Sequence, residues 1–455
     1  MLLFDQRTGP DLGAHSPVYP HSDVPRWYAD AKIGVFIHWG VYSVPAWGTP
    51  REPGQHTPIE REFINHPYAE WYANTVRIPG SPTRDFHERT YGVGTSYEDL
   101  ADRWTADRFD PDAWMSLFAA CGARYVVPTA KHHDGFCLWD SATTPFTAAR
   151  RGPRRDLLAD LSGAARRHGL RLGLYYSGAL DWHVGGFPPI RSLTDLFELR
   201  RNDREFADFT HDQLTELVDR FRPDYLWNDI DWPDSGKGRG DKDLAALFAR
   251  YLDQVPDGLV NDRWGVPYFG VPTREYVSER RTTDRVWEAC RGLGQSFGHN
   301  TAEDDRHLIT GSDLIHLLVD TVAKNGNLLI NVGPRADGSL PGNQVARLRS
   351  LGDWLTVNSP AIHGSRPWRR HTEPAGHPVR YTTREGTLYV TDLDPARGAL
   401  VPSADVAALA AGRTACWLAP GGPRPAKPEP DGTVPVPEEL RGTGAAVLAV
   451  EGAAA

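Results

Sequence analysis

Polar and aromatic side chains follow several strand-like runs of this 455-residue chain, and these residue types could carry chemistry. They fall in five segments: His38–Gly40, Lys131–Gly135, Tyr175–Ser177, Trp227–Asp229 and Asn261–Gly265. Aromatic rings stack on the C–H face of a sugar, whereas His, Asp and Arg side chains bind hydroxyl groups. The mixture therefore favours a polyhydroxylated ligand.

Asp229 is the leading candidate for covalent chemistry. It follows the apolar run Tyr225–Trp227, so we expect it to end a buried strand and to point into a cavity at the end of the sheet. The ordinary role of such an aspartate is a helix cap or a loop carboxylate, but the aromatic neighbours favour a functional role. Glycoside hydrolysis needs a second carboxylate. The candidates, which spacing alone does not rank, are Glu70, Glu275, Glu279 and Glu288.

The pair His132-His133 raises the question of a metal site. Successive strand residues face opposite sides, so adjacent histidines rarely bind one ion from a regular strand. The HExxH spacing is also absent. We therefore favour hydroxyl recognition over metal binding, with one core and one solvent-facing histidine as the ordinary alternative. The ordinary reading of Arg263 is a structural ion pair, and that of Trp71 and Trp227 is core packing.

Short apolar runs alternate with amphipathic segments between about residues 27 and 360. Expected strands are Gly34–Ile37, Tyr125–Pro128, Leu170–Tyr175, Tyr225–Trp227 and Leu328–Val332, with a shorter run at Leu259–Asn261. They are apolar on successive residues, which is typical of strands buried on both faces in a parallel sheet.

Helices are expected between these strands, over Ala113–Phe118, Asp156–His168, Phe206–Phe221, Leu244–Leu252, Leu314–Lys324 and Val345–Val357. Repeated strand–helix units indicate an α/β fold, a (β/α)8-like TIM-type barrel over residues 1–360. A doubly wound sheet is the second choice, because no glycine-rich phosphate loop follows any of the strands. Residues 361–455 have short alternating runs between Gly/Pro-rich turns, which predict a C-terminal antiparallel β-sandwich domain.

Composition excludes several classes of protein. The net charge of −9, from 50 basic and 59 acidic residues, argues against a nucleic-acid partner. No apolar run is long enough to span a membrane. The four cysteines lack CxxC spacing, and Met1–Arg7 does not begin a signal peptide. Together these features predict a cytoplasmic protein.

Eight sequence motifs, in order along the chain, resemble the α-L-fucosidases of glycoside hydrolase family 29. They are Lys32–Gly40, Glu70–Tyr72, Ala130–Phe136, Leu226–Asp229, Asn261–Gly265, Trp287-Glu288, Ser296–Gly298 and Asn331–Pro334. The resemblance covers the whole expected barrel. It implies an exo-acting retaining α-L-fucosidase that hydrolyses terminal α-L-fucosyl residues of fucosylated oligosaccharides or glycosides, without a metal or an organic cofactor.

By this resemblance Asp229 is the nucleophile that forms a covalent glycosyl-enzyme intermediate. The resemblance makes Glu275, in Thr273–Tyr276, the acid/base, with Glu279 as the fallback and Glu288 as a structural carboxylate. The implied hydroxyl-binding residues are His38, Glu70, Trp71, His132, His133, Tyr175 and Arg263. Trp227, Phe36 and Phe297 would form an apolar pocket for the C6 methyl group of fucose.

Two features depart from the family pattern. Asp231 places an extra carboxylate two residues after Asp229; it would raise the pKa of Asp229 if it pointed inward, and otherwise it would be a solvated loop residue. The polar segment Arg280–Arg285 would change how the acid/base loop closes. Alternative functions are a sugar-binding pseudoenzyme, a retaining glycosidase for a related sugar such as an α-L-galactoside, and, last, a metal-dependent hydrolase. The sequence leaves open the fucosyl linkage and whether the chain forms a homo-oligomer.

Overall fold

The computed structural model describes residues 19, 23–52, 57–268, 270–373 and 378–454. The segment Met1–Arg7, in which we expect no signal peptide, lies outside these residues. None of the described helices is both long and apolar enough to cross a membrane.

Eight parallel strands form a curled sheet in the order β5-β4-β3-β2-β1-β8-β7-β6. Their bounds are β1 (Ile33–Ile37), β2 (Tyr125–Lys131), β3 (Arg171–Ser177), β4 (Tyr225–Asp229), β5 (Leu259–Val260), β6 (Thr273–Glu275), β7 (Trp287–Gly292) and β8 (Gly326–Val332). Strands β1, β2, β4 and β8 are buried at every residue. This explains their continuous apolar sequences, because helices cover one face and the barrel interior the other.

β5 and β6 are the two edges of the sheet, and the segment just before β6 joins them across a narrow seam. The backbone N–H groups of Gly270 and Val271 both donate to the carbonyl of Val260, at 3.1 and 3.2 Å. Closure excludes the doubly wound alternative and confirms the predicted barrel. The barrel is irregular at this seam, because the described residues between β5 and β7 form no helix.

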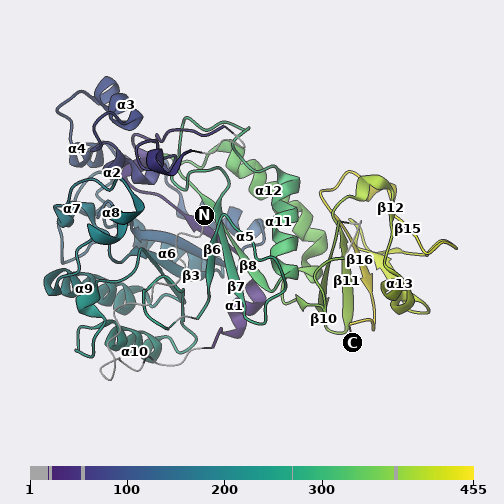
Figure 1. The fold of residues 1–455 in the computed structure, drawn as a ribbon. Coiled ribbons are helices and arrows are strands. Elements are labelled where there is room, and N and C mark those ends of the chain that lie inside the picture. Colours follow the sequence, from purple (N-terminus) through teal and green to yellow (C-terminus); the bar gives the residue numbers. More distant parts are fainter. Residues whose placement is uncertain (1–18, 20–22, 53–56, 269, 374–377, 455) are drawn as a thin grey trace.

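Long helices surround the barrel (Figure 1). They are α5 (Pro111–Ala120), α6 (Leu157–Arg167), α9 (Arg204–Phe221), α10 (Leu244–Gln254), α11 (Gly311–Ala323) and α12 (Gly342–Asn358). Shorter helices are α1 (Arg26–Ala31), α2 (Tyr72–Thr75), α3 (Pro82–Tyr91), α4 (Tyr97–Asp102), α7 (Trp182–Gly185) and α8 (Leu193–Glu198). Helix α5 begins two residues before the predicted Ala113, because the Asp110 side chain accepts from the Ala113 N–H and Pro111 occupies the first turn.

The C-terminal part has two antiparallel sheets, as predicted. A six-stranded sheet has the order β14-β13-β16-β11-β10-β9, and β12 pairs with β15. The elements are β9 (Arg366–Pro367), β10 (Val379–Arg384), β11 (Thr387–Asp392), β12 (Ala399–Leu400), α13 (Ala404–Ala410), β13 (Ala415–Trp417), β14 (Arg424–Pro425), β15 (Val434–Pro435) and β16 (Ala446–Val450).

This domain lies beside α11 and α12 (Figure 1). Arg380 of β10 pairs with Asp320 of α11 at 2.6 Å, and the Trp354 indole N–H donates to the carbonyl of Ala445 at 2.8 Å. Helix α12 ends at Asn358 and β9 begins at Arg366; the domain boundary at residue 360 stays a prediction.

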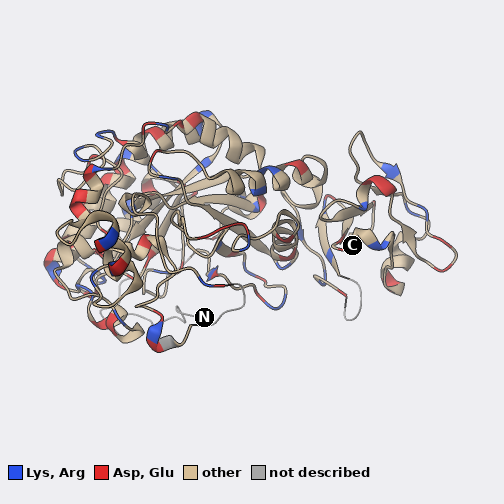
Figure 2. Ribbon diagram, turned by 90° about the horizontal axis from the view of Figure 1, so that it is seen from above, with Lys and Arg blue, Asp and Glu red and all other residues tan. Residues whose placement is uncertain are grey.

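Acidic and basic residues are interspersed along the helices that surround the barrel (Figure 2). Many of them pair across neighbouring turns and helices, such as Arg250 with Asp219 and Arg204 with Asp208.

Candidate active site

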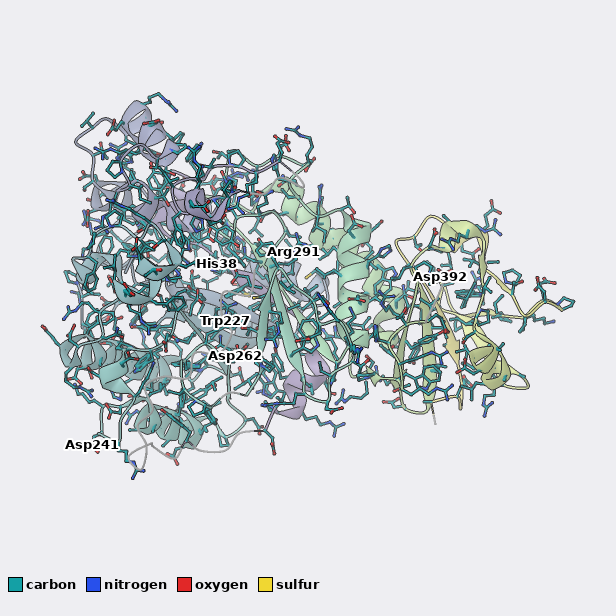
Figure 3. All side chains as sticks on the ribbon, viewed as in Figure 1. His38, Trp227, Asp241, Asp262, Arg291 and Asp392 are labelled. Carbon is teal, nitrogen blue, oxygen red and sulfur yellow. The ribbon has the colours of Figure 1, made fainter. Side chains whose placement is uncertain are left out.

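One cavity of about 510 Å³ lies at the carboxyl ends of the barrel strands. Its lining includes all twelve residues that the sequence predicts for the site: Phe36, His38, Glu70, Trp71, His132, His133, Tyr175, Trp227, Asp229, Arg263, Glu275 and Phe297. Figure 3 shows two of them, His38 and Trp227, within the barrel. This is the end of a barrel where active sites form, and the individual roles stay predictions.

Asp229 is the last residue of β4 and is almost fully buried. Its Oδ1 accepts from Arg263 Nη1 at 2.9 Å and from the Ile230 N–H at 3.0 Å. Its Oδ2 accepts from the Tyr175 hydroxyl at 2.9 Å. Burial alone would raise the pKa of Asp229, but the charge of Arg263 and these hydrogen bonds lower it below its ordinary value. Asp229 is therefore kept ionised, as a nucleophile requires.

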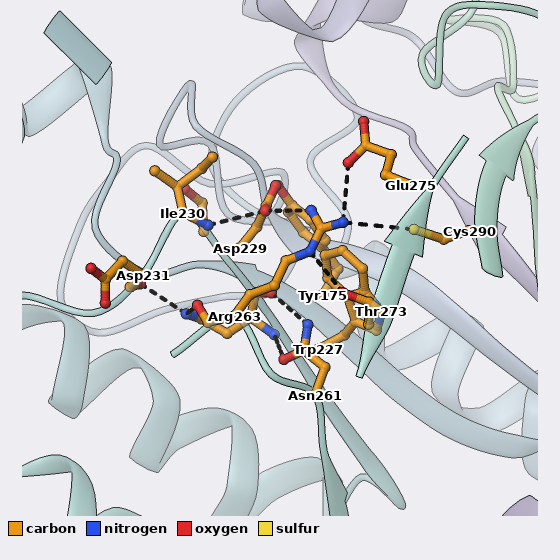
Figure 4. A network of polar contacts seen from close by, with 12 residues as sticks. Tyr175, Trp227, Asp229, Ile230, Asp231, Asn261, Arg263, Thr273, Glu275 and Cys290 are labelled. Carbon is orange, nitrogen blue, oxygen red and sulfur yellow. Dashed lines mark hydrogen bonds and ion pairs between the residues drawn. The ribbon is translucent and has the colours of Figure 1, made fainter. Parts of the chain in front are cut away.

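Arg263 connects Asp229 to a second carboxylate. While Nη1 binds Asp229, Nη2 donates to Glu275 Oε2 at 3.1 Å (Figure 4). The guanidinium also lies 4.6 Å from the ring centroid of Trp227, and its Nε donates to Thr273 Oγ1 at 3.0 Å. A planar guanidinium fixed on so many sides holds both carboxylates in one orientation.

Of the three carboxylates named as alternatives to Glu275, Glu70 lines the cavity, whereas Glu279 and Glu288 do not. Glu279 pairs with Arg274 at 2.9 Å. Glu288 is fully buried in the barrel interior and accepts four hydrogen bonds. The donors are the hydroxyls of Tyr28, Tyr125 and Tyr225 and the indole of Trp227, at 2.7 to 3.1 Å. These contacts give Glu288 the structural position that the resemblance implies.

Glu70, in the 3₁₀ turn Ala69–Trp71, holds the loop after β7 in place. Its Oε2 accepts from the Gly298 N–H at 2.8 Å and from the Ser296 hydroxyl at 3.2 Å. Burial raises the pKa of Glu70 to about 7, and these donors offset only part of that effect. Glu70 thus lines the cavity while fixing the backbone beside Phe297.

The histidines are held as neutral rings with defined tautomers. Asn331 donates its amide to the Phe297 carbonyl at 2.6 Å, so its oxygen accepts from His38 Nδ1 at 2.7 Å. Similarly, Ser177 donates to a backbone carbonyl and accepts from His133 Nδ1 at 2.6 Å. Burial lowers the pKa of His38 to about 3 and that of His133 to about 4. Each ring therefore keeps an unprotonated Nε2, which can accept a substrate hydroxyl.

Both His132 and His133 line the cavity, in contrast to the alternation of a regular strand. The reason is that β2 ends at Lys131, so the two histidines lie on irregular backbone. Their ring centroids are 4.1 Å apart, and His132 stacks on Tyr175 at 5.4 Å.

Within the described residues, no three His, Cys, Asp or Glu side chains are grouped to hold a metal ion.

The predicted apolar pocket forms around Phe36. Its ring centroid lies 4.9 Å from that of Trp227 and 6.3 Å from that of Phe297. Tyr175 stacks on Trp227 at 5.4 Å and lies 5.7 Å from Phe36, so the three rings contact one another. Rings from β1, β3, β4 and the loop after β7 thus make one apolar wall beside His38, whose ring lies 4.6 Å from that of Phe36 and 5.0 Å from that of Phe297.

Asp231 does not point toward Asp229. Its carboxylate pairs with Arg200 at 2.7 Å and with Lys237 at 2.9 Å, and it is not among the residues that line the cavity. Of the two alternatives for Asp231, the inward orientation, which would raise the pKa of Asp229, is not observed, because Arg200 and Lys237 hold the side chain on the outer side of the turn.

Three residues with contacts in the site were not predicted. The Tyr68 hydroxyl donates to Glu275 Oε1 at 3.2 Å, Asn331 orients His38, and Cys290 lies 3.8 Å from Arg263 Nη2. The sequence contains a pattern that could have pointed to Asn331, because a polar residue near the end of an apolar run marks the rim of the cavity. No local pattern points to Tyr68 or Cys290, because their contacts join segments far apart in the sequence.

Protonation of His38 should make stability depend on pH. Below the ordinary histidine pKa of 6.5 the unfolded chain binds a proton that the folded His38 excludes, so acid favours unfolding. Between pH 7 and pH 5 the wild-type protein should lose about 2 kcal/mol more unfolding free energy than His38→Asn. Urea titrations of both proteins at the two pH values measure this difference. Equal losses would show that folded His38 binds a proton normally.

Comparison with known proteins identifies the family. The sequence profile described as alpha-L-fucosidase matches residues 17–360. The chain is 35% identical to the tissue alpha-L-fucosidase of Rattus norvegicus over 393 residues, covering 83% of this chain and 79% of the relative. It is 34% identical to the alpha-L-fucosidase of Dictyostelium discoideum, covering 76% and 73%. The crystal structure of Thermotoga maritima alpha-fucosidase superimposes with a TM-score of 0.82 at 42% identity, over 94% of this chain and 97% of that one.

A barrel with paired carboxylates in a cavity lined by histidine and aromatic side chains defines a glycoside hydrolase. The chain belongs to the α-L-fucosidase family, glycoside hydrolase family 29. Its activity is the hydrolysis of α-L-fucosides, and fucosylated glycosides are its substrates.

Proposed function

We propose that the enzyme removes terminal α-L-fucosyl residues by a retaining mechanism in which Asp229 is the nucleophile and Glu275 the acid/base. The observation that carries the proposal is the Arg263 guanidinium, which binds both carboxylates in the same cavity. In retaining enzymes the two carboxyl groups are about 5–5.5 Å apart, closer than the about 6.5–9.5 Å of inverting enzymes. A single guanidinium between the two favours the closer arrangement.

In the first step an Asp229 oxygen bonds to the anomeric carbon, the glycosidic bond breaks, and Glu275 gives its proton to the departing oxygen. In the second step Glu275 takes a proton from water, and the water oxygen bonds to the same carbon as the ester to Asp229 breaks. Arg263 and Tyr175 stabilise the carboxylate that is released. Each step inverts the anomeric carbon, so the configuration is retained overall.

Related structures support a fucose-binding cavity in this fold. The T. maritima alpha-fucosidase, 42% identical to this chain, has been solved in complex with fucose and with a mechanism-based inhibitor. In this chain the buried rings of Phe36 and Trp227, on strands of the barrel, line the cavity. Rings fixed in the barrel would close the cavity behind a bound sugar, which suits a terminal residue rather than the middle of a glycan.

The stereochemistry of the first product tests the proposal. Hydrolysis of an aryl α-L-fucoside, followed by proton NMR within the first minutes, should give α-L-fucose before mutarotation forms the β anomer. Initial appearance of β-L-fucose would show inversion and exclude the covalent mechanism. Binding of fucose without turnover would instead favour the sugar-binding pseudoenzyme.

The apolar wall formed by Phe36, Trp227 and Phe297 should select the C6 methyl group of fucose. Because one such group is worth only about 1–3 kcal/mol in an apolar pocket, kcat/KM should favour an α-L-fucoside over the 6-hydroxylated α-L-galactoside by about 10–200-fold. Phe297→Ser should lower this ratio, mainly through weaker fucoside turnover. Phe63→Ser, which alters a ring packed on Trp71 in the same cavity, should leave it unchanged. If the ratio of kcat/KM for the two sugars is the same in both variants and in wild type, Phe297 does not recognise the methyl group.

We also propose a reducing, cytoplasmic location. Cys121, Cys137, Cys290 and Cys416 are all free thiols, and three of them are buried. Cell fractionation tests this directly, and recovery of the enzyme in an extracellular or periplasmic fraction would contradict it.

A further inference from the structure

Two consecutive residues after Asp229 adopt left-handed backbone conformations. The φ angles are 56° at Ile230 and 73° at Asp231. A β-branched residue such as isoleucine rarely adopts this region. Such conformations persist where the surrounding structure holds them, and they concentrate at functional sites.

The turn orients the groups proposed to act in catalysis. The Ile230 N–H donates to Asp229 Oδ1 at 3.0 Å, and the Asp231 N–H donates to the backbone carbonyl of Arg263 at 3.0 Å (Figure 4). The Asn228 side chain adds to this link by donating to the carbonyls of Asp231 and Arg263, at 2.8 and 2.9 Å. The same turn therefore aims the nucleophile and anchors the loop of the arginine that binds both carboxylates.

The Asp231 carboxylate holds the turn in this conformation. Its Oδ2 accepts from Arg200 Nη1 at 2.7 Å, and its Oδ1 pairs with Lys237 Nζ at 2.9 Å. Oδ1 also accepts from the Trp232 N–H at 2.7 Å. The side chain of Lys237 is 2% exposed and that of Arg200 is 9% exposed, so both cations are largely withdrawn from water. Gly265 leaves the space for this carboxylate, since a Cβ there would lie 1.6 Å from Asp231 Oδ1.

We propose that Asp231 is a positioning residue: by pairing with Arg200 and Lys237 it locks the left-handed turn that aims Asp229 and fixes the loop of Arg263. The proposal rests on the nucleophile role proposed above for Asp229. Asp231 itself does not line the cavity and touches no substrate. It acts through the backbone N–H groups of residues 230 and 231.

Two substitutions distinguish the effect of losing the carboxylate from the effect of an unfavourable backbone conformation. Asp231→Gly permits the positive φ and removes the side chain, whereas Asp231→Asn tolerates the positive φ and keeps the shape without the charge. The matched control is Asp320→Asn, because Asp320 is 17% exposed and also pairs with two cations, Lys324 and Arg380, each at 2.6 Å. Asp320 lies outside the cavity, between the barrel and the C-terminal domain.

The readouts are kcat and KM on an aryl α-L-fucoside, the rate of covalent labelling by a 2-deoxy-2-fluoro-α-L-fucosyl fluoride, and the thermal midpoint. A displaced nucleophile should lower kcat and the labelling rate of both Asp231 variants by about 10²-fold, with KM changed little. The label should still fall on Asp229. Asp320→Asn should lose a similar amount of thermal stability and keep its kcat and labelling rate.

Two results would overturn the proposal. One is wild-type kcat and labelling rate in both Asp231 variants. The other is a loss of activity that matches the loss of folded protein and is shared by Asp320→Asn, which would show a purely structural role. Failure of the proposed function is distinguishable, because wild-type enzyme would then carry its label on a residue other than Asp229.

Discussion

Asp229→Ala is expected to lower kcat on an aryl α-L-fucoside by roughly 10⁴-fold or more, the size of effect seen when a covalent nucleophile is removed. The variant lacks the oxygen that bonds to the anomeric carbon, and water that enters its space is a much weaker nucleophile than a carboxylate. Arg263 keeps its contact with Glu275, so the protein should still fold.

The product formed with azide tests whether Asp229 is the nucleophile. In the space left by the Asp229 side chain, azide should attack the fucoside once and give the inverted β-L-fucosyl azide. The thermal midpoint serves as the control for folding. Activity within tenfold of wild type in folded Asp229→Ala, or an α-azide product, would show that Asp229 is not the nucleophile.

Glu275→Ala is expected to reduce kcat/KM by about 10²–10⁴-fold on fucosides with poor leaving groups, which need a proton as the bond breaks. The loss should be much smaller on an aryl fucoside whose phenol leaves without protonation. Azide should accelerate the variant and yield α-L-fucosyl azide, because it attacks the covalent intermediate after the first inversion. The two variants therefore differ in the anomer that azide produces.

Glu279→Ala and Glu288→Gln are the controls for Glu275. Glu279 pairs with Arg274 outside the cavity lining, so its removal should leave the dependence on leaving group unchanged. Glu288→Gln disturbs the four-donor cluster in the barrel interior and should lower thermal stability without azide rescue. Azide rescue of Glu279→Ala but not of Glu275→Ala would transfer the acid/base role to Glu279.

The barrel was predictable from sequence because its main strands are buried on both faces. Continuous apolar runs mark β1, β2, β4 and β8, and the polar residue that ends such a run marks the rim of the cavity. Asp229 could be located by this rule. Helix bounds were close as well, because caps such as Asp110 and Asp156 act locally.

Other parts of the site depend on contacts that no local pattern contains. Strand β6 has three residues and no apolar run, so the assignment of Glu275 rests on family resemblance rather than on periodicity. Strand alternation placed His132 and His133 on opposite faces, but the strand ends one residue before them. The direction of Asp231 depends on Arg200 and Lys237, which reach it from other segments.

The nucleophile assignment is tested most directly by the site of covalent labelling. Wild-type enzyme treated with a 2-deoxy-2-fluoro-α-L-fucosyl fluoride, digested and examined by tandem mass spectrometry should carry one fluorofucosyl group, esterified to Asp229. A label on another carboxylate, or stoichiometric inactivation with no ester on the peptide that contains Asp229, would contradict the assignment.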